Sequence, residues 1–163
     1  MVDRLAYAAM FTLLLVSCGG DPAAADIQTY AAAMSSPLEK NQALAQHFLD
    51  IASGVKKGET TGEKIADVMV KELVPEADAL VAEVSAIQPS TPKLKDAHSG
   101  LVKAWTDRSG AYHAMADAWT VGDLAAFDAA QKRNLQSKLD EERYFTEANA
   151  IAGEYGLVIT QYP

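Results

Sequence analysis

Core-phase residues recur at alternating steps of four and three positions in the second half of this 163-residue chain. They are Leu94, His98, Leu101, Trp105, Arg108, Tyr112, Met115 and Trp119. A mean spacing of 3.5 residues keeps one face of an α-helix against its neighbours, whereas a strand would need alternation at every second residue. We therefore expect a helix that begins at Thr91-Pro92, where threonine caps the helix and proline takes its first position.

Two earlier segments carry helical spacing that a proline interrupts. The first covers about residues 26 to 53, and its expected core face is Ile27, Tyr30, Met34, Leu38, Ala45, Phe48 and Ala52. The second opens at Thr60-Thr61-Gly62-Glu63 with a capping box, ends before Pro89, and has the core face Ile65, Val68, Met69, Leu73, Leu80, Val84 and Ile87. Because proline removes a backbone hydrogen bond, Pro37 predicts a kink or a stop and restart, and Pro75 predicts a second kink.

A fourth helical segment follows a turn at Thr120-Val121-Gly122-Asp123 and runs to about Gly153 or Gly156. The residues available to its core are Leu124, Phe127, Leu135, Leu139, Phe145 and Ala152. Four helices of similar length joined by short links predict an all-α fold, an antiparallel up-down-up-down four-helix bundle over residues 26–163. The apolar tail after Gly156 is expected to pack as a short C-terminal segment on one end of that bundle.

The charge and cysteine content exclude several classes of protein. The net charge is −8, and removal of residues 1–17 leaves it unchanged because one Asp and one Arg are lost together. An acidic surface repels nucleic-acid phosphates, so no nucleic-acid partner is expected. A single cysteine cannot form an internal disulfide, a multi-cysteine zinc site or a CxxCH haem attachment.

The amino terminus accounts for that cysteine. Residues 5–17 form an apolar run too short to span a membrane but typical of a signal peptide. The run ends in Leu15-Val16-Ser17-Cys18, which resembles the lipobox of bacterial lipoproteins. The resemblance implies cleavage between Ser17 and Cys18 and a diacylglycerol on the Cys18 thiol, which would anchor the protein to the membrane. The alternative is an ordinary signal peptide that contains an incidental cysteine.

The resemblance also implies an address and a set of boundaries. Residues 1–17 would be the signal peptide, residues 18–25 a lipidated tether, and residues 26–163 the helical domain. In enteric bacteria an aspartate directly after the lipidated cysteine tends to retain a lipoprotein in the inner membrane, and here that position is Gly19. We therefore expect a location in the cell envelope, on the outer membrane facing the periplasm.

Polar residues on the core stripes form the first candidate site. His98 and Arg108 lie on the third helix, and Gln131, Glu142 and Asn149 lie on the fourth. If a hairpin turns near residue 121, His98 lies opposite about residue 144 and can meet Glu142 or Tyr144, while Arg108 lies opposite about residue 134. The cluster His98, Arg108, Glu142 and Asn149 would then either fix the helix register or form a ligand pocket with a His-Glu proton-transfer pair.

A second candidate is the aromatic series Trp105, Tyr112 and Trp119, which recurs every seven residues. These rings would either line a pocket for an apolar ligand or form a core seam.

Metal and haem sites have little support in the sequence. None of the three histidines has Glu three residues before it, which excludes a di-iron carboxylate site. His47 with Asp50, and His113 with Asp117, place a carboxylate within one turn of an imidazole, a pattern that also arises by chance in acidic helices. Haem ligation could draw on Met34, Met69 and Met115, but methionines at helical spacing are usually core residues. We therefore expect no bound cofactor and no metal.

Two functions remain open. The sequence contains no Gly-rich phosphate loop and no GxSxG motif, and a lipidated Cys18 could not act as a nucleophile, so no enzymatic activity is expected. The first hypothesis is a non-catalytic envelope lipoprotein that contacts the membrane through its lipid and binds another envelope protein. The alternative is a carrier or sensor that holds a small molecule, haem or metal in a pocket between the helices.

Overall fold

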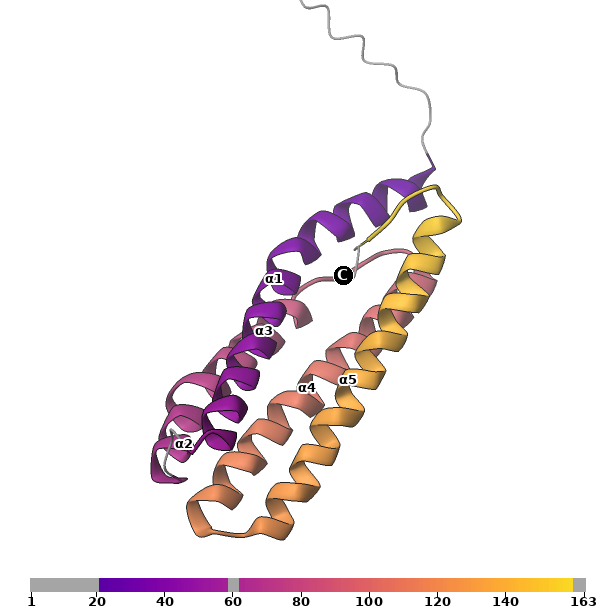
Figure 1. Ribbon diagram of the computed structural model, residues 1–163. Helices are drawn as coiled ribbons and strands as arrows, with labels where there is room; N and C mark the ends of the chain where they lie inside the picture. Colours follow the sequence, from indigo (N-terminus) through magenta and orange to yellow (C-terminus); the bar gives the residue numbers. More distant parts are fainter. Residues whose placement is uncertain (1–20, 59–61, 160–163) are drawn as a thin grey trace, which may run out of the picture.

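A computed structural model of the chain describes residues 21–58 and 62–159. Within these ranges every regular element is helical, which confirms the all-α prediction. Four helical segments follow one another in Figure 1. The first is α1 (Pro22–Lys56), the second joins α2 (Gly62–Val68), η1 (Met69–Leu73) and α3 (Val74–Ser85), and the last two are α4 (Pro92–Val121) and α5 (Leu124–Gly153).

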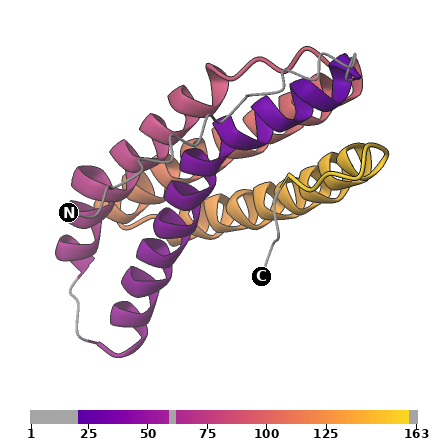
Figure 2. The same ribbon diagram turned by 90° about the horizontal axis from the view of Figure 1, so that it is seen from above.

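Helix α4 is the central element of the packing. Its most extensive contacts are with α5, and α3, α2 and η1 also pack against it. Figures 1 and 2 both show α4 and α5 side by side, joined by a tight turn. The backbone of α1 approaches α3 and η1 more closely than it approaches α5. The first and last helices are therefore held together mainly by long side chains.

The turn between α4 and α5 confirms its prediction. Gly122 has φ 73°, a left-handed conformation that glycine adopts without strain, and it ends α4. The side chain of Asp123 then caps α5 by accepting a hydrogen bond of 2.9 Å from the amide of Ala126.

Helix α1 begins four residues earlier than predicted. The Asp21 carboxylate caps it by accepting a hydrogen bond of 2.8 Å from the amide of Ala23, and Pro22 occupies the first turn. The last part of the expected tether, residues 22–25, is therefore helical. The helix also continues through Gly54 to Lys56, three residues beyond its expected end at about residue 53.

The two interrupting prolines act differently. Helix α1 is continuous through Pro37, so a stop and restart does not occur there, although Figure 2 shows that the helix bends part-way along its length. Before Pro75 the chain forms the π-helical turn η1, where the amide of Val74 donates to the carbonyl of Met69. The extra residue in that turn accommodates a proline that cannot donate a backbone hydrogen bond. The predicted capping box at Thr60 falls partly outside the described residues.

The core confirms the third predicted stripe and corrects the first and fourth. Every member of the α4 stripe is buried except Trp119, which is partly exposed. Beyond Pro37 the buried residues of α1 are Asn41 and Leu44, while Ala45 and Ala52 are exposed. On α5 the expected core residues Leu124, Leu135 and Leu139 are exposed, and the buried face is Ala130, Ser137, Glu141, Tyr144, Phe145, Ala148, Ile151 and Ala152.

The segment after α5 packs on that helix. The amide of Ile159 donates a hydrogen bond of 3.1 Å to the side-chain oxygen of Asn149, and the Ile159 side chain is buried in the core. Among the described residues, no helix combines the length and apolar character that crossing a membrane requires.

Candidate functional site: a groove between α1 and α5

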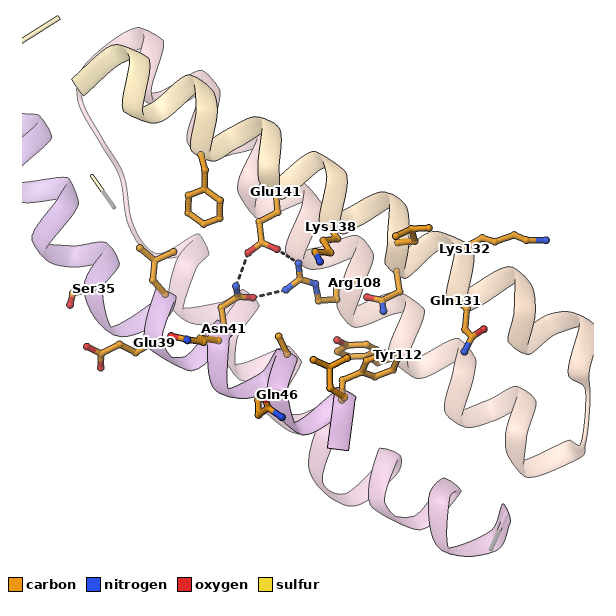
Figure 3. A pocket seen from close by; sticks show the side chains of 18 of the residues that line it. Ser35, Glu39, Asn41, Gln46, Arg108, Tyr112, Gln131, Lys132, Lys138 and Glu141 are labelled. Atoms are coloured by element: carbon orange, nitrogen blue, oxygen red, sulfur yellow. Dashed lines mark hydrogen bonds and ion pairs between the residues drawn. The ribbon is translucent and has the colours of Figure 1, made fainter. Parts of the chain in front are cut away.

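A groove of about 930 Å³ runs between α1 and α5. Its lining extends along α1 from Ala31 to Leu49 and along α5 from Asp128 to Phe145. Helix α4 contributes Arg108 and Tyr112 to the floor, as Figure 3 shows. The groove exists because α1 and α5 are joined by a few long side chains and not by close backbone packing.

A closed polar network forms the floor of this groove (Figure 3). The guanidinium of Arg108 pairs with the carboxylate of Glu141, and it also donates to the side-chain oxygen of Asn41 at 2.5 Å. Asn41 in turn donates to Glu141 at 2.6 Å, and the indole of Trp105 donates to the same carboxylate at 3.1 Å. Helices α1, α4 and α5 are therefore tied together at one point.

The burial of this network determines what it can do. Arg108, Glu141 and Asn41 expose only 6%, 2% and 6% of their surface. A buried charge must be paired and hydrogen-bonded, and here each charged group has both a counter-ion and an amide partner. The network thus fixes the register of three helices and presents no net charge to the groove.

A second buried chain of hydrogen bonds links α1 to α4 and α5. The Tyr30 hydroxyl lies 2.9 Å from His98 Nδ1 and 2.6 Å from the Tyr144 hydroxyl. On the other side of the ring, His98 Nε2 lies 3.1 Å from the carbonyl oxygen of Val84. A carbonyl can only accept, so Nε2 carries the proton, Nδ1 accepts from Tyr30, and the Tyr30 oxygen accepts from Tyr144.

Burial keeps the side chains of His98, Tyr30 and Tyr144 neutral. It lowers the pKa of His98, and the hydrogen bond to the Val84 carbonyl only partly offsets that effect. It also raises the pKa of Tyr144 to about 12, and together with the neighbouring Tyr144 it raises the pKa of Tyr30. Each polar atom in this series of hydrogen bonds has a partner while the side chains are neutral. The role of these hydrogen bonds is therefore to position the helices.

The predicted polar cluster forms only in part. His98 does approach Tyr144, but through the hydroxyl of Tyr30. Arg108 pairs with Glu141 and not with a residue near 134, and the predicted Glu142 is exposed. No His-Glu pair forms at His98.

The remaining polar candidates on α5 lie outside the buried networks. Asn149 is half-buried and accepts the hydrogen bond from the C-terminal segment. Gln131 is exposed and lies in the α5 wall of the groove.

The aromatic candidates do not share one pocket. Trp105 is buried against the polar network, and Trp119 packs edge-on against Phe127 with ring centroids 5.0 Å apart. Only Tyr112 reaches the groove, where its ring stacks on Phe48 at 5.2 Å. Burial raises the Tyr112 pKa to about 12, so this hydroxyl is neutral at physiological pH. Trp105 and Trp119 belong to the core seam.

His47 makes contacts across helices and not within its own turn. Its Nδ1 lies 3.0 Å from the carboxylate of Glu76, and its Nε2 lies 3.6 Å from that of Glu72. Asp50, the predicted neighbour, interacts with Gln46 instead. Because the two glutamates approach opposite nitrogens of the ring, the three side chains do not converge on one point.

His113 also has a partner on another helix. Its Nε2 lies 3.0 Å from Asp78, which also accepts a hydrogen bond from the Ser109 hydroxyl, so the predicted pairing with Asp117 is replaced. Within residues 21–58 and 62–159, no group of three or more His, Cys, Asp or Glu side chains is arranged to hold a metal ion. Met34, Met69 and Met115, which were expected from the sequence to be core residues and not haem ligands, are buried in the core outside the groove.

Sequence reasoning missed two members of the groove floor, Asn41 and Glu141. Asn41 was missed because it is polar: the buried face of α1 keeps steps of three and four through Met34, Pro37, Asn41 and Leu44, whereas the expected face followed the apolar residues to Leu38 and Ala45. Glu141 was missed because sequence reasoning chose the neighbouring Glu142. An error of one position on a helix rotates the expected face by about 100°. Arg108 offered the available signal for Glu141. Sequence reasoning placed Arg108 in the core without a carboxylate partner, and a buried guanidinium requires one.

Comparison of the chain with protein-family models, curated proteins and solved structures finds no match.

Proposed function

We propose that this chain is a bacterial lipoprotein, anchored in the cell envelope through lipid on Cys18, whose helical domain binds another envelope protein without catalysing a reaction. The anchor is supported by Leu15-Val16-Ser17-Cys18 and the apolar run before it, which lie outside the described residues. Only Gly19, Gly20 and Asp21 separate the cysteine from the first residue of α1. The anchor would therefore hold the domain close to the membrane surface.

The observation that carries the binding role is the groove between α1 and α5. It is about 930 Å³, open to solvent, and lined by polar residues together with apolar side chains, of which Leu38, Phe48 and Leu135 were expected in the core. Exposed apolar surface of this kind, bordered by polar residues, marks interaction sites in soluble domains. The polar groups of its floor bind one another, which leaves the apolar walls and the exposed rim for a partner.

The proposal includes the finer architecture. We propose that the four helical segments form an antiparallel up-down-up-down bundle that is incompletely closed between its first and last helices. The tight hairpin of α4 and α5 and the short link of residues 86–91 between α3 and α4 favour that arrangement. Incomplete closure explains why apolar residues of α1 and α5 remain exposed.

A small-molecule carrier is the second candidate. The groove volume falls within the range of about 300 to 1,000 Å³ that is typical of small-ligand sites. Native mass spectrometry of the protein isolated from its host would reveal a stoichiometric bound compound if this candidate were correct. A protein of unliganded mass would favour the protein-binding role.

Metabolic labelling with a fatty acid tests the anchor. The wild-type chain should be labelled, processed to residues 18–163 and recovered with the outer membrane on a density gradient. Cys18→Ala should remain unprocessed and unlabelled. Normal processing of that variant would contradict the lipoprotein assignment.

A further inference from the structure

Two stripes of side chains face each other across the groove. On α1 the stripe steps alternately by four and three positions through Ala31, Ser35, Leu38, Gln42, Ala45 and Leu49. On α5 it steps through Asp128, Gln131, Leu135 and Lys138, with Phe145 one heptad later. This spacing of 3.5 residues is the one that a neighbouring helix meets when it packs side by side.

The dimensions of the groove also suit a helix. At about 1.5 Å per residue, the lining spans roughly 27 Å along α1 and roughly 26 Å along α5. Both lengths correspond to about five turns of a helix laid between them. A compact ligand would cover only part of these stripes, whereas a helix would cover both from end to end.

The walls expose apolar side chains at intervals along this length. Leu49 on α1 and Leu135 on α5 are 59% and 60% exposed, and Leu38 and Phe48 are partly exposed. Ala31 and Ala45 on the α1 wall are small, which lets a backbone approach closely. An occupant therefore needs an apolar face of its own.

The α1 wall and the α5 wall of the groove carry side chains of opposite charge. Glu39 on α1 and Lys138 on α5 line the groove, and within the described part of the chain neither forms an ion pair with another side chain. Lys132 is already paired with Asp128 at 2.7 Å. A helix with a basic flank toward Glu39 and an acidic flank toward Lys138 would complement both walls.

The net charge of the whole chain favours some partners over others. A net charge of −8 attracts a cationic partner over long range and opposes association with a second copy of the same chain. The Arg108–Glu141 pair neutralises the floor, so a small anion would find no free counter-charge there.

We propose that the groove between α1 and α5 is the docking site for an amphipathic helix of about five turns, cationic overall, from a partner protein. This inference rests on the proposed function and adds the chemistry of the partner. The apolar face of the helix lies against Leu38, Leu49 and Leu135, and its charged flanks select its orientation through Glu39 and Lys138.

The test uses a synthetic helical peptide of roughly 18 residues, the length that five turns require. It carries leucines at alternating spacings of three and four, lysines on one flank and fewer glutamates on the other. A scrambled peptide of the same composition lacks the apolar stripe. Binding to the full-length lipidated protein in detergent micelles is measured by fluorescence anisotropy, after subtraction of binding to empty micelles.

The expected result is binding of the striped peptide and not of the scrambled one. Leu49→Asp and Leu135→Asp should each weaken binding by roughly tenfold or more, as for central interface residues. Leu124→Asp is the matched control, because Leu124 is 73% exposed and lies outside the groove, and it should bind as the wild type does. Glu39→Lys combined with Lys138→Glu should favour a peptide whose flanks are exchanged.

Equal binding of both peptides, or equal loss in the Leu124 and Leu135 variants, would overturn the helical partner. A wild-type protein that binds neither peptide would also overturn it. Equal unfolding temperatures of the wild type and the variants show that a loss of binding does not come from unfolding. Fatty-acid labelling and cross-linking in the envelope report on the proposed function separately. If those results stand while the peptide fails, only the helical nature of the partner is lost.

Discussion

The guanidinium of Arg108 on α4 and the carboxylate of Glu141 on α5 form an ion pair whose side chains are only 7% and 3% exposed. Asn41 of α1 bonds to both of them, so the pair connects the central helix to each wall of the groove. The integrity of the groove floor therefore depends on these three residues.

Breaking the pair on one side should strongly destabilise the protein. Arg108→Met leaves a buried carboxylate without its counter-ion, and we expect a loss of about 3 to 5 kcal/mol in the free energy of unfolding. Adding Glu141→Gln should recover most of that loss, because the amide oxygen still accepts from Trp105 while no unpaired charge remains. Urea unfolding of the wild type, both single variants and the double variant gives the coupling energy. Independent, additive losses would contradict the ion pair.

The Tyr30 hydroxyl should contribute more to stability than the Tyr112 hydroxyl. Tyr30→Phe leaves His98 Nδ1 and the Tyr144 hydroxyl without their partner, which should cost about 1 to 3 kcal/mol. Tyr112→Phe is the control, since its hydroxyl forms no hydrogen bond with another described residue and its ring would keep its stacking on Phe48. Equal thermal stability of the two variants would show that the hydroxyl chain does not hold α1 in place.

His98 should make the stability depend on pH. Its pKa is lower in the folded protein than the ordinary value of 6.5, so between the two values the unfolded chain binds the proton more readily than the folded one. The contribution of neutral His98 is then complete above about pH 6.5 and is lost as the pH falls through the lower, folded-state pKa. His98→Gln can accept from Tyr30 and donate to Val84 without titrating, so the stability difference from wild type should change across this window. A constant difference from pH 8 to pH 5 would contradict the burial of a neutral imidazole.

Removing the imidazole altogether should destabilise the fold. His98→Ala leaves the Tyr30 hydroxyl and the Val84 carbonyl without their partner and creates a cavity in a residue position that is only 4% exposed. A lower melting temperature than that of His98→Gln is expected in thermal unfolding followed by circular dichroism. Wild-type stability in the alanine variant would mean that the histidine is at the surface.

The sequence predicts the helices of this fold better than it predicts which face of each helix is buried. Helix α4 lies between neighbours on several sides, so its apolar stripe is long and regular, and Leu94 to Met115 are buried as expected. Helix α5 packs against α4 through small residues such as Ala130 and Ala148, which carry a weak apolar signal. The leucines of α5 dominate its apolar pattern although they are exposed. The core face inferred from them was therefore rotated away from the buried one.

The groove could not be inferred from local spacing. It depends on where α1 and α5 stand relative to each other, and that position is set by Tyr30, Asn41 and their partners more than 60 residues away. The bend in α1 cannot be inferred from the periodicity, because the buried residues keep steps of three and four from Ile27 through Pro37 to Leu44.

Site-specific cross-linking in the native envelope tests the central claim most directly. A photoreactive amino acid at Leu135, in the groove wall, should give one discrete protein adduct, and the striped helical peptide should suppress it. The same amino acid at Leu124, which is more exposed but lies outside the groove, should give none. Identical adducts at both positions, or an adduct at Leu124 alone, would contradict the assignment of the groove between α1 and α5 as the binding site.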